Sequence, residues 1–491
     1  MPRIQPLLVL CCVAFACLAQ PQSPHAITIV HVNVVDVVAG DIRPDQTVLI
    51  ANGRITALGP ANTINVPAGS TPISGQGKYL SPGLWDMHVH LRSNHDNPVV
   101  PLVRENESML DLFLPNGVVG IREMGGDLSD HVIQWRDEIR AGRREGPRIL
   151  TAGRKLDNDP PEWPGSIGVA GPEEARQAVR QVKEAGADFV KVYFRDVKPE
   201  VFQAVIEEAH RQHLKVTGHK PFEMSLQEFI ETGVDGLEHC LYLPAMPREQ
   251  YDALVREYLS RRGKPWAADA REIAGRAIVL EDAKEEDRVY HLMAGRQIWL
   301  TPTLEISSRV QNELRDYESD KRKLYFFPAL WVFRKVQPPP PALIQEVAKR
   351  REQATLAAFK AGVPMILGTD CGANNMYMVP GWSVHEELQA LVRIGLTPAE
   401  ALRMATLNAA KWRGATDEGS VDVGKVADLV LLRSDPLSDI RHTQEVDSVL
   451  QGGRHYSRSD LDAMLKRAQE RATQATQTSG AVCCSQANAL P

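Results

Sequence analysis

The sequence predicts an α/β protein: a (β/α)8 TIM-like barrel that carries a small β-sandwich domain built from both chain ends. Between residues 79 and 414, short apolar runs alternate with stretches that have helical periodicity. Strands that alternate with helices pair in parallel through right-handed crossovers, and eight such units close a barrel. On both sides of this region apolar and polar residues alternate, which is typical of half-buried antiparallel strands.

The segment 1–19 has the pattern of a secretory signal peptide. Arg3 supplies a positive charge, and the apolar run that follows and ends at Ala19 is too short for an ordinary membrane span. We expect cleavage near Ala19 and export to the periplasm or the medium. Lipoprotein anchoring through Cys17 is a weaker alternative because the bulky Phe15 lies just upstream, and a buried N-terminal segment is another. No other stretch is apolar enough for a stable membrane span.

Residues 27–78 and 415–456 are expected to form the β-sandwich together. The first segment contains the runs TIVHVNVVDVV, QTVLIANG and RITALG, separated by turn-forming residues. In the second, residues 424–432 (GKVADLVLL) and 446–456 (VDSVLQGGRHY) have the same alternation. Residues 457–491 become rich in Gln, Thr, Ser and Ala towards the end of the chain, so we expect a terminal helix that ends in a disordered tail.

Residues 79–414 are expected to form the barrel. Candidate strands lie at residues 79–90, 117–125, 147–155, 187–194, 215–219, 234–240, 297–304 and 363–370. Amphipathic runs such as PEVFQAVIEEAHRQH fill most of the intervals, and Pro199 is well placed at a helix start. Two intervals, 244–296 and 305–360, are longer than a crossover needs, so they either build a substrate pocket or decorate the periphery.

Six residues that suit a metal site lie at or near the ends of these apolar runs. They are His88, His90, Lys191, His219, His239 and Asp370. Barrel enzymes place their reactive groups at the C-terminal ends of the strands. Each residue alone has an ordinary explanation: a hydrogen-bonded structural histidine, a lysine paired with a carboxylate, or an aspartate that caps a helix. Together they predict a metal centre at the mouth of the barrel.

The residue types explain how such a centre would be built. His88 and His90 lie two apart, so both imidazoles point to the same side of a strand and can share one ion. Asp86 continues this alternation and is a candidate partner for an imidazole N–H, or a polar group at the barrel floor. Lys191 cannot ligate a cation as an ammonium, which has no lone pair, but a lysine carboxylated by carbon dioxide has two oxygens that can bridge two ions. Asp370 can contact a metal and also carry a proton.

Composition narrows the classes of partner. The chain has 491 residues, of which 43% are hydrophobic, so a large core can form. Its formal net charge of −6, from 56 basic and 62 acidic residues, argues against nucleic-acid binding.

Cys240 and Cys371 each follow a proposed ligand, so they point to the opposite face of the strand and should be small buried hydrophobes. The number of subunits stays open, a homo-oligomer included.

Two motifs give the chain a clear resemblance to the amidohydrolase superfamily. They are SPGLWDMHVHL at residues 81–91 and GLTPAEALRMATLNAAKWRGATDEGSVDVGKVADLVLL at residues 395–432. The chain is most similar to the imidazolonepropionase- and prolidase-related branch, which includes dipeptidases for Xaa-Pro or Xaa-Arg substrates and hydrolases of N-acyl amino acids. It keeps Lys191, which the mononuclear imidazolonepropionases lack, so that particular activity is not expected.

The resemblance implies a centre of two divalent metal ions. The proposed ligands divide into one group per ion and a bridge: His88, His90 and Asp370; His219 and His239; and N6-carboxylated Lys191. Zinc suits this set of nitrogen and oxygen ligands best, with manganese, iron and cobalt as alternatives.

The expected reaction is hydrolysis of a C–N amide bond by a hydroxide that bridges the metals, with Asp370 carrying the proton to the leaving nitrogen. The expected substrate is a small molecule, either a dipeptide or an N-acyl amino acid, whose carboxylate Tyr193 and Arg195 would bind. The alternative is that they are only a tyrosine at the rim and an arginine on the surface. Weaker candidates near the seventh strand are His291, Thr301 and Thr303. A lactone, cyclic amide or phosphotriester hydrolase on the same site is the first alternative, and a non-catalytic scaffold is the second.

Overall fold

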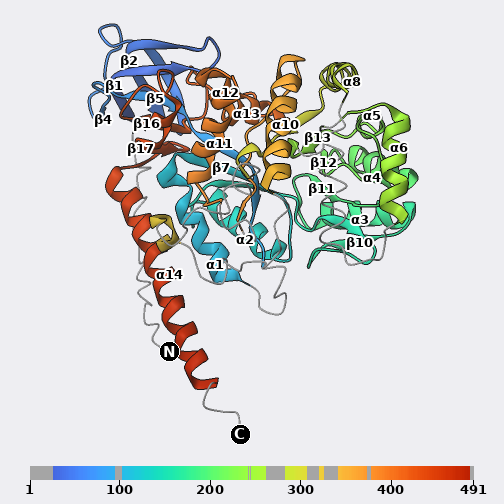
Figure 1. The fold of residues 1–491 in the computed structure, drawn as a ribbon. Helices are drawn as coiled ribbons and strands as arrows, with labels where there is room; N and C mark the ends of the chain where they lie inside the picture. The colour runs from blue at the N-terminus through green and yellow to red at the C-terminus, as the bar shows by residue number, and fades with distance from the viewer. Residues whose placement is uncertain are drawn as a thin grey trace, which may run out of the picture.

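The computed structural model describes residues 26–93, 102–240, 243, 245–260, 282–306, 320–325, 341–372 and 378–486. The expected signal peptide (1–19), the last residues of the expected tail (487–491) and parts of both long intervals lie outside these ranges. Figure 1 shows a sheet at one end of the molecule and, beside it, a body of parallel strands surrounded by helices. The C-terminal helix α14 (Arg458–Gln486) runs along this body and extends beyond it.

Both chain ends meet in one sheet, as the alternating patterns predicted. Its eight strands are β1 (Ile27–Asp36), β2 (Asp41–Ala51), β3 (Arg54–Pro60), β4 (Thr71–Ser74), β5 (Tyr79–Pro82), β16 (Leu429–Leu432), β17 (Val446–Gln451) and β18 (Arg454–Tyr456). They are hydrogen-bonded in the order β18-β17-β16-β5-β1-β2-β3, with β4 beside β1. The hydrogen bonds therefore join all eight strands in a single sheet, whereas the sequence predicted a sandwich.

The predicted strand 79–90 is two strands in the structure. β5 pairs with β1 and β16 in the composite sheet, and β6 (Leu84–His90) pairs with β7 (Val118–Glu123) in the parallel body. Gly83 separates them, and a Cβ placed there would lie 2.4 Å from Val119 Cγ2. The chain thus passes from one sheet to the other at a position where only glycine fits.

The remaining strands form two parallel sheets, so the α/β class and the parallel pairing are confirmed. The first sheet has the order β15-β6-β7-β8, and the second has the order β10-β9-β11-β12-β13-β14. Their further members are β8 (Arg148–Thr151), β9 (Leu156–Asn158), β10 (Ile167–Val169), β11 (Val190–Tyr193), β12 (Val216–Gly218), β13 (Gly236–Glu238), β14 (Trp299–Thr301) and β15 (Cys371–Gly372). The candidate residues lie on or directly after these strands.

A few backbone hydrogen bonds connect the two parallel sheets on both sides. Asp188 N donates to Thr151 O at 2.8 Å between β8 and the start of β11. On the other side Leu300 N donates to Pro364 O at 2.9 Å, and Met87 N donates to Leu367 O at 2.9 Å. Continuous strand ladders do not close the ring among the described residues.

The predicted eighth strand at 363–370 is not a regular strand. It makes one isolated parallel bridge, between Leu300 and Met365, and the assigned strand β15 begins only at Cys371. Pro364 has no N–H for a ladder, and Asp370 has a φ of 60°, outside the β region. The segment still lies between β14 and β6, as predicted, because it is hydrogen-bonded to Leu300 on one side and to Met87 on the other.

Helices cover the parallel strands, as the amphipathic runs predicted. They are α1 (Val103–Met109), α2 (Ser129–Arg140), α3 (Pro172–Glu184), α4 (Pro199–Arg211), α5 (Leu226–Glu231), α6 (Arg248–Ser260), α8 (Ala283–Gly295), α10 (Pro341–Lys360), α11 (Trp382–Arg393), α12 (Pro398–Ala405) and α13 (Leu407–Arg413). Pro199 starts α4, which buries Val201, Phe202 and Val205. Within the part of the chain described, no helix has both the length and the apolar character that crossing a bilayer requires.

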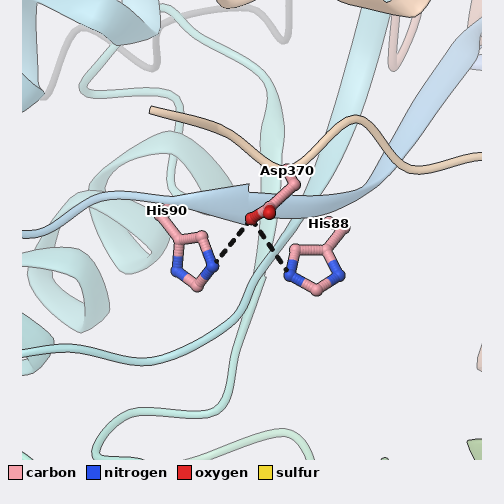
Figure 2. A group of neighbouring side chains, drawn as sticks. All are labelled: His88, His90 and Asp370. Atoms are coloured by element: carbon pink, nitrogen blue, oxygen red, sulfur yellow. Dashed lines mark ion pairs between the residues drawn. The ribbon is translucent and has the colours of Figure 1, made fainter. Parts of the chain in front are cut away.

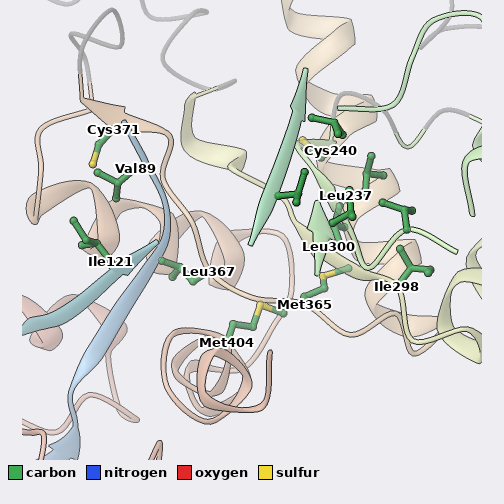
Figure 3. Close-up of a cluster of buried hydrophobic side chains, with 14 of the residues drawn as sticks. Val89, Ile121, Leu237, Cys240, Ile298, Leu300, Met365, Leu367, Cys371 and Met404 are labelled. Carbon is green, nitrogen blue, oxygen red and sulfur yellow. The ribbon is translucent and has the colours of Figure 1, made fainter. Parts of the chain in front are cut away.

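The two cysteines that follow proposed ligands are buried in the core, as predicted. Cys240 is 2% exposed and Cys371 is 0% exposed, and both are free thiols. Figure 3 shows Cys371 in one group of apolar side chains and Cys240 in another, with Met365 and Met404 between the groups. Packing in the 363–370 region therefore joins the two parallel sheets that hydrogen bonds link only sparsely.

Candidate metal centre

Three of the candidate ligands converge on one point at the end of β6. His88 Nε2 lies 3.4 Å from Asp370 Oδ1, and His90 Nε2 lies 3.1 Å from the same atom. One ligand-type atom from each residue lies within 4.8 Å of the others. Figure 2 shows both imidazoles facing the Asp370 carboxylate, which comes from the segment before β15. The spacing of the two histidines thus brings both to one carboxylate, as the sequence predicted.

The other two histidines form a second pair next to the first group. His219 follows β12 and His239 follows β13, and their Nε2 atoms are 2.9 Å apart. The His239 ring lies 4.7 Å from the His88 ring, centroid to centroid. The four imidazoles and Asp370 therefore make one continuous cluster at the strand ends.

Lys191 lies on β11 within the electrostatic reach of this cluster: burial lowers the pKa of both His88 and His219, and the positive charge of Lys191 adds to this shift. Its side chain is 1% exposed, and within the described ranges Nζ makes no hydrogen bond. Burial lowers the pKa of Lys191 to about 8, although the charges of Glu238 and Asp370 oppose the shift. The structure thus holds an amine in an environment where its neutral, nucleophilic form is accessible.

The donor set fits a group of divalent cations. Burial lowers the pKa of all four histidines, to about 3 for His239, so these imidazoles are neutral and carry lone pairs. His88 Nε2 and His90 Nδ1 are buried and make no hydrogen bond in the described part of the chain. Neutral imidazole nitrogens beside a carboxylate are the ligands that zinc and related metals prefer.

A buried carboxylate orients His88, and it was not among the residues predicted from the sequence. Glu238 Oε2 lies 2.7 Å from His88 Nδ1, which is then the protonated nitrogen and leaves Nε2 free to bind a metal. Arg122 Nη2 donates to Glu238 Oε1 at 2.7 Å, and the Thr217 hydroxyl donates to the same oxygen. Burial alone would raise the pKa of Glu238, but Arg122 and His88 hold it well below its usual value.

Asp86 does not contact an imidazole, so its proposed role as partner of a histidine N–H is wrong. Its carboxylate instead accepts hydrogen bonds from the Thr369 hydroxyl at 2.6 Å and from Thr369 N at 3.0 Å. Burial raises the pKa of Asp86 to about 7 against these hydrogen bonds. Asp86 fastens the segment that carries Asp370 to β6, and from His88 it accepts the backbone N–H at 3.2 Å rather than an imidazole N–H.

The backbone is strained at three positions around the cluster. His239, Thr303 and Asp370 have φ values of 71°, 46° and 60°. Non-glycine residues in this region cost of the order of 1 kcal/mol or more and are common at functional sites. Thr303 uses this conformation to place its hydroxyl 2.7 Å from His239 Nδ1. Of the weaker candidates, Thr303 therefore contacts a proposed ligand directly, and Thr301 accepts a hydrogen bond from Arg122 at 3.0 Å.

The three predicted substrate-binding residues have different surroundings. Tyr193 packs against His219, with ring centroids 4.5 Å apart, so the structure brings it to the cluster. Arg195 forms an ion pair with Glu162. The structure does not bring His291 to the cluster: it lies on α8 with its side chain 63% exposed, and its ring contacts Asp287 O at 2.8 Å.

Replacing Glu238 by glutamine is expected to weaken metal binding by about 10- to 100-fold, because the amide cannot accept hydrogen bonds from both His88 and Arg122. Titration of the metal-free protein with Zn²⁺ measures the change. Glu249→Gln, at an exposed position of α6, is the matched control and should bind like the wild type. Equal Zn²⁺ affinity in Glu238→Gln and wild type would mean that Glu238 does not orient a ligand.

The body of the protein consists of parallel strands and helices, and four histidines and an aspartate gather at the strand ends. This arrangement is typical of barrel enzymes, which carry out their chemistry at the C-terminal ends of the strands. Residues 79–455 match the amidohydrolase family, and the chain belongs to this family. The protein is thus a hydrolytic enzyme, and membership of this family implies a TIM-like barrel with a separate domain.

Three relatives illustrate the match. Ochratoxinase from Aspergillus niger is 26% identical over 431 residues, which cover 76% of this chain and 75% of that protein. A Xaa-Pro dipeptidase solved with methionine in its active site has a TM-score of 0.65 at 21% identity and covers 88% of this chain and 100% of its own. Bottromycin amidohydrolase has a TM-score of 0.68 at 23% identity and covers 92% and 91%. The two solved structures share the fold of this chain.

Proposed function

We propose that the protein is a metal-dependent hydrolase of C–N amide bonds, with a dipeptide or an N-acyl amino acid as substrate. One observation carries the proposal: four histidines and Asp370 form one cluster, and the charge of Lys191, whose buried amine lacks a hydrogen bond among the described residues, acts on this cluster. The names of the relatives, a dipeptidase, a bottromycin amidohydrolase and an ochratoxinase, support amide chemistry for this chain.

We propose that the ligands serve two divalent ions, as the resemblance to the family implies. His88, His90 and Asp370 would hold one, and His219 and His239 would hold the other, with zinc best suited to these donors. The Lys191 amine would attack carbon dioxide and lose a proton, which gives a carbamate whose two oxygens can bridge the pair. When bound, such ions lower the pKa of a coordinated water from 15.7 to about 7 and polarise a substrate carbonyl.

Asp370 is placed to move the proton that amide hydrolysis requires. An amine is a poor leaving group unless its nitrogen is protonated as the C–N bond breaks. The Asp370 carboxylate lies within 3.4 Å of both His88 Nε2 and His90 Nε2, and its side chain is only 13% exposed. We propose that it accepts one proton of the attacking water and delivers it to nitrogen, so that water and amide become a carboxylic acid and an amine, which then ionise to a carboxylate and an ammonium group.

The test is a substrate screen on purified protein reconstituted with zinc. The expected result is turnover of Xaa-Pro or Xaa-Arg dipeptides, or of N-acyl amino acids, and its loss on chelation. The screen includes lactones, cyclic amides and phosphotriesters. If one of these is hydrolysed while every linear amide is inert, the amide assignment is wrong and the same site serves a different bond.

A further inference from the structure

A buried carboxylate from helix α11 holds the backbone that follows β14. Glu387 is 0% exposed, and its two oxygens accept hydrogen bonds from Leu304 N at 2.8 Å and from Glu305 N at 2.7 Å. These two N–H groups belong to a helical turn at residues 304–306. A carboxylate is costly to bury unless it is hydrogen-bonded, so the two contacts account for an acidic side chain at this position.

Thr303 comes directly before this helical turn but does not cap it. A threonine in such a position usually has an extended backbone, and its hydroxyl accepts a hydrogen bond from the second or third N–H of the helix. Thr303 instead has a φ of 46°, and its hydroxyl lies 2.7 Å from His239 Nδ1. Glu387 binds the first two N–H groups of the turn from another helix. The Thr303 hydroxyl is therefore available to His239.

The backbone around Thr303 is fixed from both sides. On one side, His239 N donates to Thr301 O at 2.8 Å, which holds the end of β14 to the end of β13. On the other side, Glu387 holds the helical turn to α11. A residue other than glycine keeps a positive φ only where the surrounding structure determines it. Without the Glu387 contacts Thr303 would be free to relax, and its hydroxyl would move away from His239.

Thr303 contacts the ring nitrogen of His239 that does not face the other proposed ligand. The Nε2 atoms of His239 and His219 are 2.9 Å apart, so these are the nitrogens that would share an ion. A hydrogen bond at Nδ1 fixes the orientation of an imidazole and leaves Nε2 to bind a metal. Thr303 is thus placed to do for His239 what Glu238 does for His88.

We propose that Glu387 is a positioning residue of the metal centre. From α11 it holds the residues after β14 in the conformation that directs the Thr303 hydroxyl to His239, and it thereby raises the affinity for the ion that His219 and His239 would hold. Glu387 acts through Thr303 and is not itself a ligand. The inference rests on the proposed function, because it requires that ion.

A double-mutant cycle, read out by zinc titration of the metal-free protein, tests the proposal. Glu387→Leu removes both acceptor oxygens, and Thr303→Val removes the hydroxyl. Each should weaken the binding of one zinc ion by about 10- to 100-fold and change that of the other by less than about threefold. Because Glu387 acts through Thr303, the double variant should bind this ion no more weakly than the weaker single variant. Thr303→Ser, which keeps the hydroxyl, and the exposed control Glu249→Gln on α6 should bind like wild type.

Three results of the titration overturn the proposal. The first is zinc binding by Glu387→Leu equal to that of wild type. The second is an equal loss of affinity for both ions, which would indicate a general structural role. The third is a double variant whose loss is the product of the two single losses, because Glu387 would then act independently of Thr303. Glu387→Gln keeps one acceptor oxygen; it replaces Glu387→Leu if that variant does not fold, with a smaller loss expected for the same ion.

The ring-nitrogen NMR signals of His239 in the metal-free protein give a readout that requires neither zinc nor turnover. The signals are assigned by their absence from His239→Gln. Thr303→Val and Glu387→Leu should shift them in the same direction, because both changes take the hydroxyl away from Nδ1. If these shifts are found in a protein that binds no zinc, the result counts only against the proposed function. Signals in Glu387→Leu that match those of wild type overturn the positioning role.

Discussion

Replacing Asp370 by asparagine is expected to lower kcat by about 10²- to 10⁴-fold, the range that a positioned acid–base group contributes. Asparagine has nearly the same shape, so the segment before β15 and its contacts with His88 and His90 should persist. Its amide cannot accept and release a proton at neutral pH, so the delivery of a proton to the leaving nitrogen is lost. This is the largest effect that we expect from one substitution.

Steady-state kinetics of Asp370→Asn at saturating zinc, with metal content measured on the same sample, checks this prediction. The expected pattern is a low kcat in protein that still carries most of its metal. Asp287→Asn, at a 74% exposed side chain on α8, is the control and should keep wild-type rates. A kcat within tenfold of wild type in fully loaded Asp370→Asn would contradict the proton-transfer role.

Replacing Lys191 by methionine is expected to remove about one of two metal equivalents and to lower turnover by at least about 100-fold. Methionine fills nearly the same volume in an apolar strand, so the fold should tolerate it. It has no amine, so no carbamate can form to bridge two ions. Lys183→Met, on α3, is the exposed lysine control.

The chemistry of Lys191 gives an independent readout. The reaction joins the amine nitrogen to the carbon of carbon dioxide and releases a proton, so reconstitution of metal-free wild-type protein should be faster with added bicarbonate. The lowered pKa of Lys191, about 8, makes a larger fraction of neutral amine available than for an exposed lysine. If Lys191→Met retains both the metal content and the rate of wild type, the bridging role is refuted.

The positions of the proposed ligands could be predicted because they depend only on where strands end. A strand of alternating side chains places His88 and His90 on one side, and parallel strands bring their C-terminal ends to one edge. Asp370 was predicted at that edge although its segment is not a regular strand. The position of Asp370 along the chain was sufficient to place it at this edge, although the secondary structure there differs from the predicted strand.

The hydrogen-bond partners of these ligands could not be predicted, because they depend on which strands are neighbours and on their register. Alternation alone left Asp86 as either a partner of a histidine N–H or a polar group at the barrel floor, and its side-chain partner proved to be Thr369 from the neighbouring segment. The carboxylate that contacts His88 is Glu238, which lies 150 positions away. A charged residue within the apolar run VDGLEHC was the available signal, since a buried carboxylate requires partners.

The contacts of the residues proposed to bind substrate were also difficult to predict from the sequence. Tyr193 was found because it shares the face of Lys191 on one strand. Arg195 continues the alternation in sequence, but its ion pair with Glu162 is a tertiary contact.

The central claim is that residues from distant parts of the chain hold a pair of metal ions, and anomalous diffraction from crystals of zinc-reconstituted protein tests it most directly. The account predicts two peaks at the zinc absorption edge, one among His88, His90 and Asp370 and one between His219 and His239, with density joining Lys191 to both. No anomalous peak among these side chains in zinc-loaded crystals would contradict it.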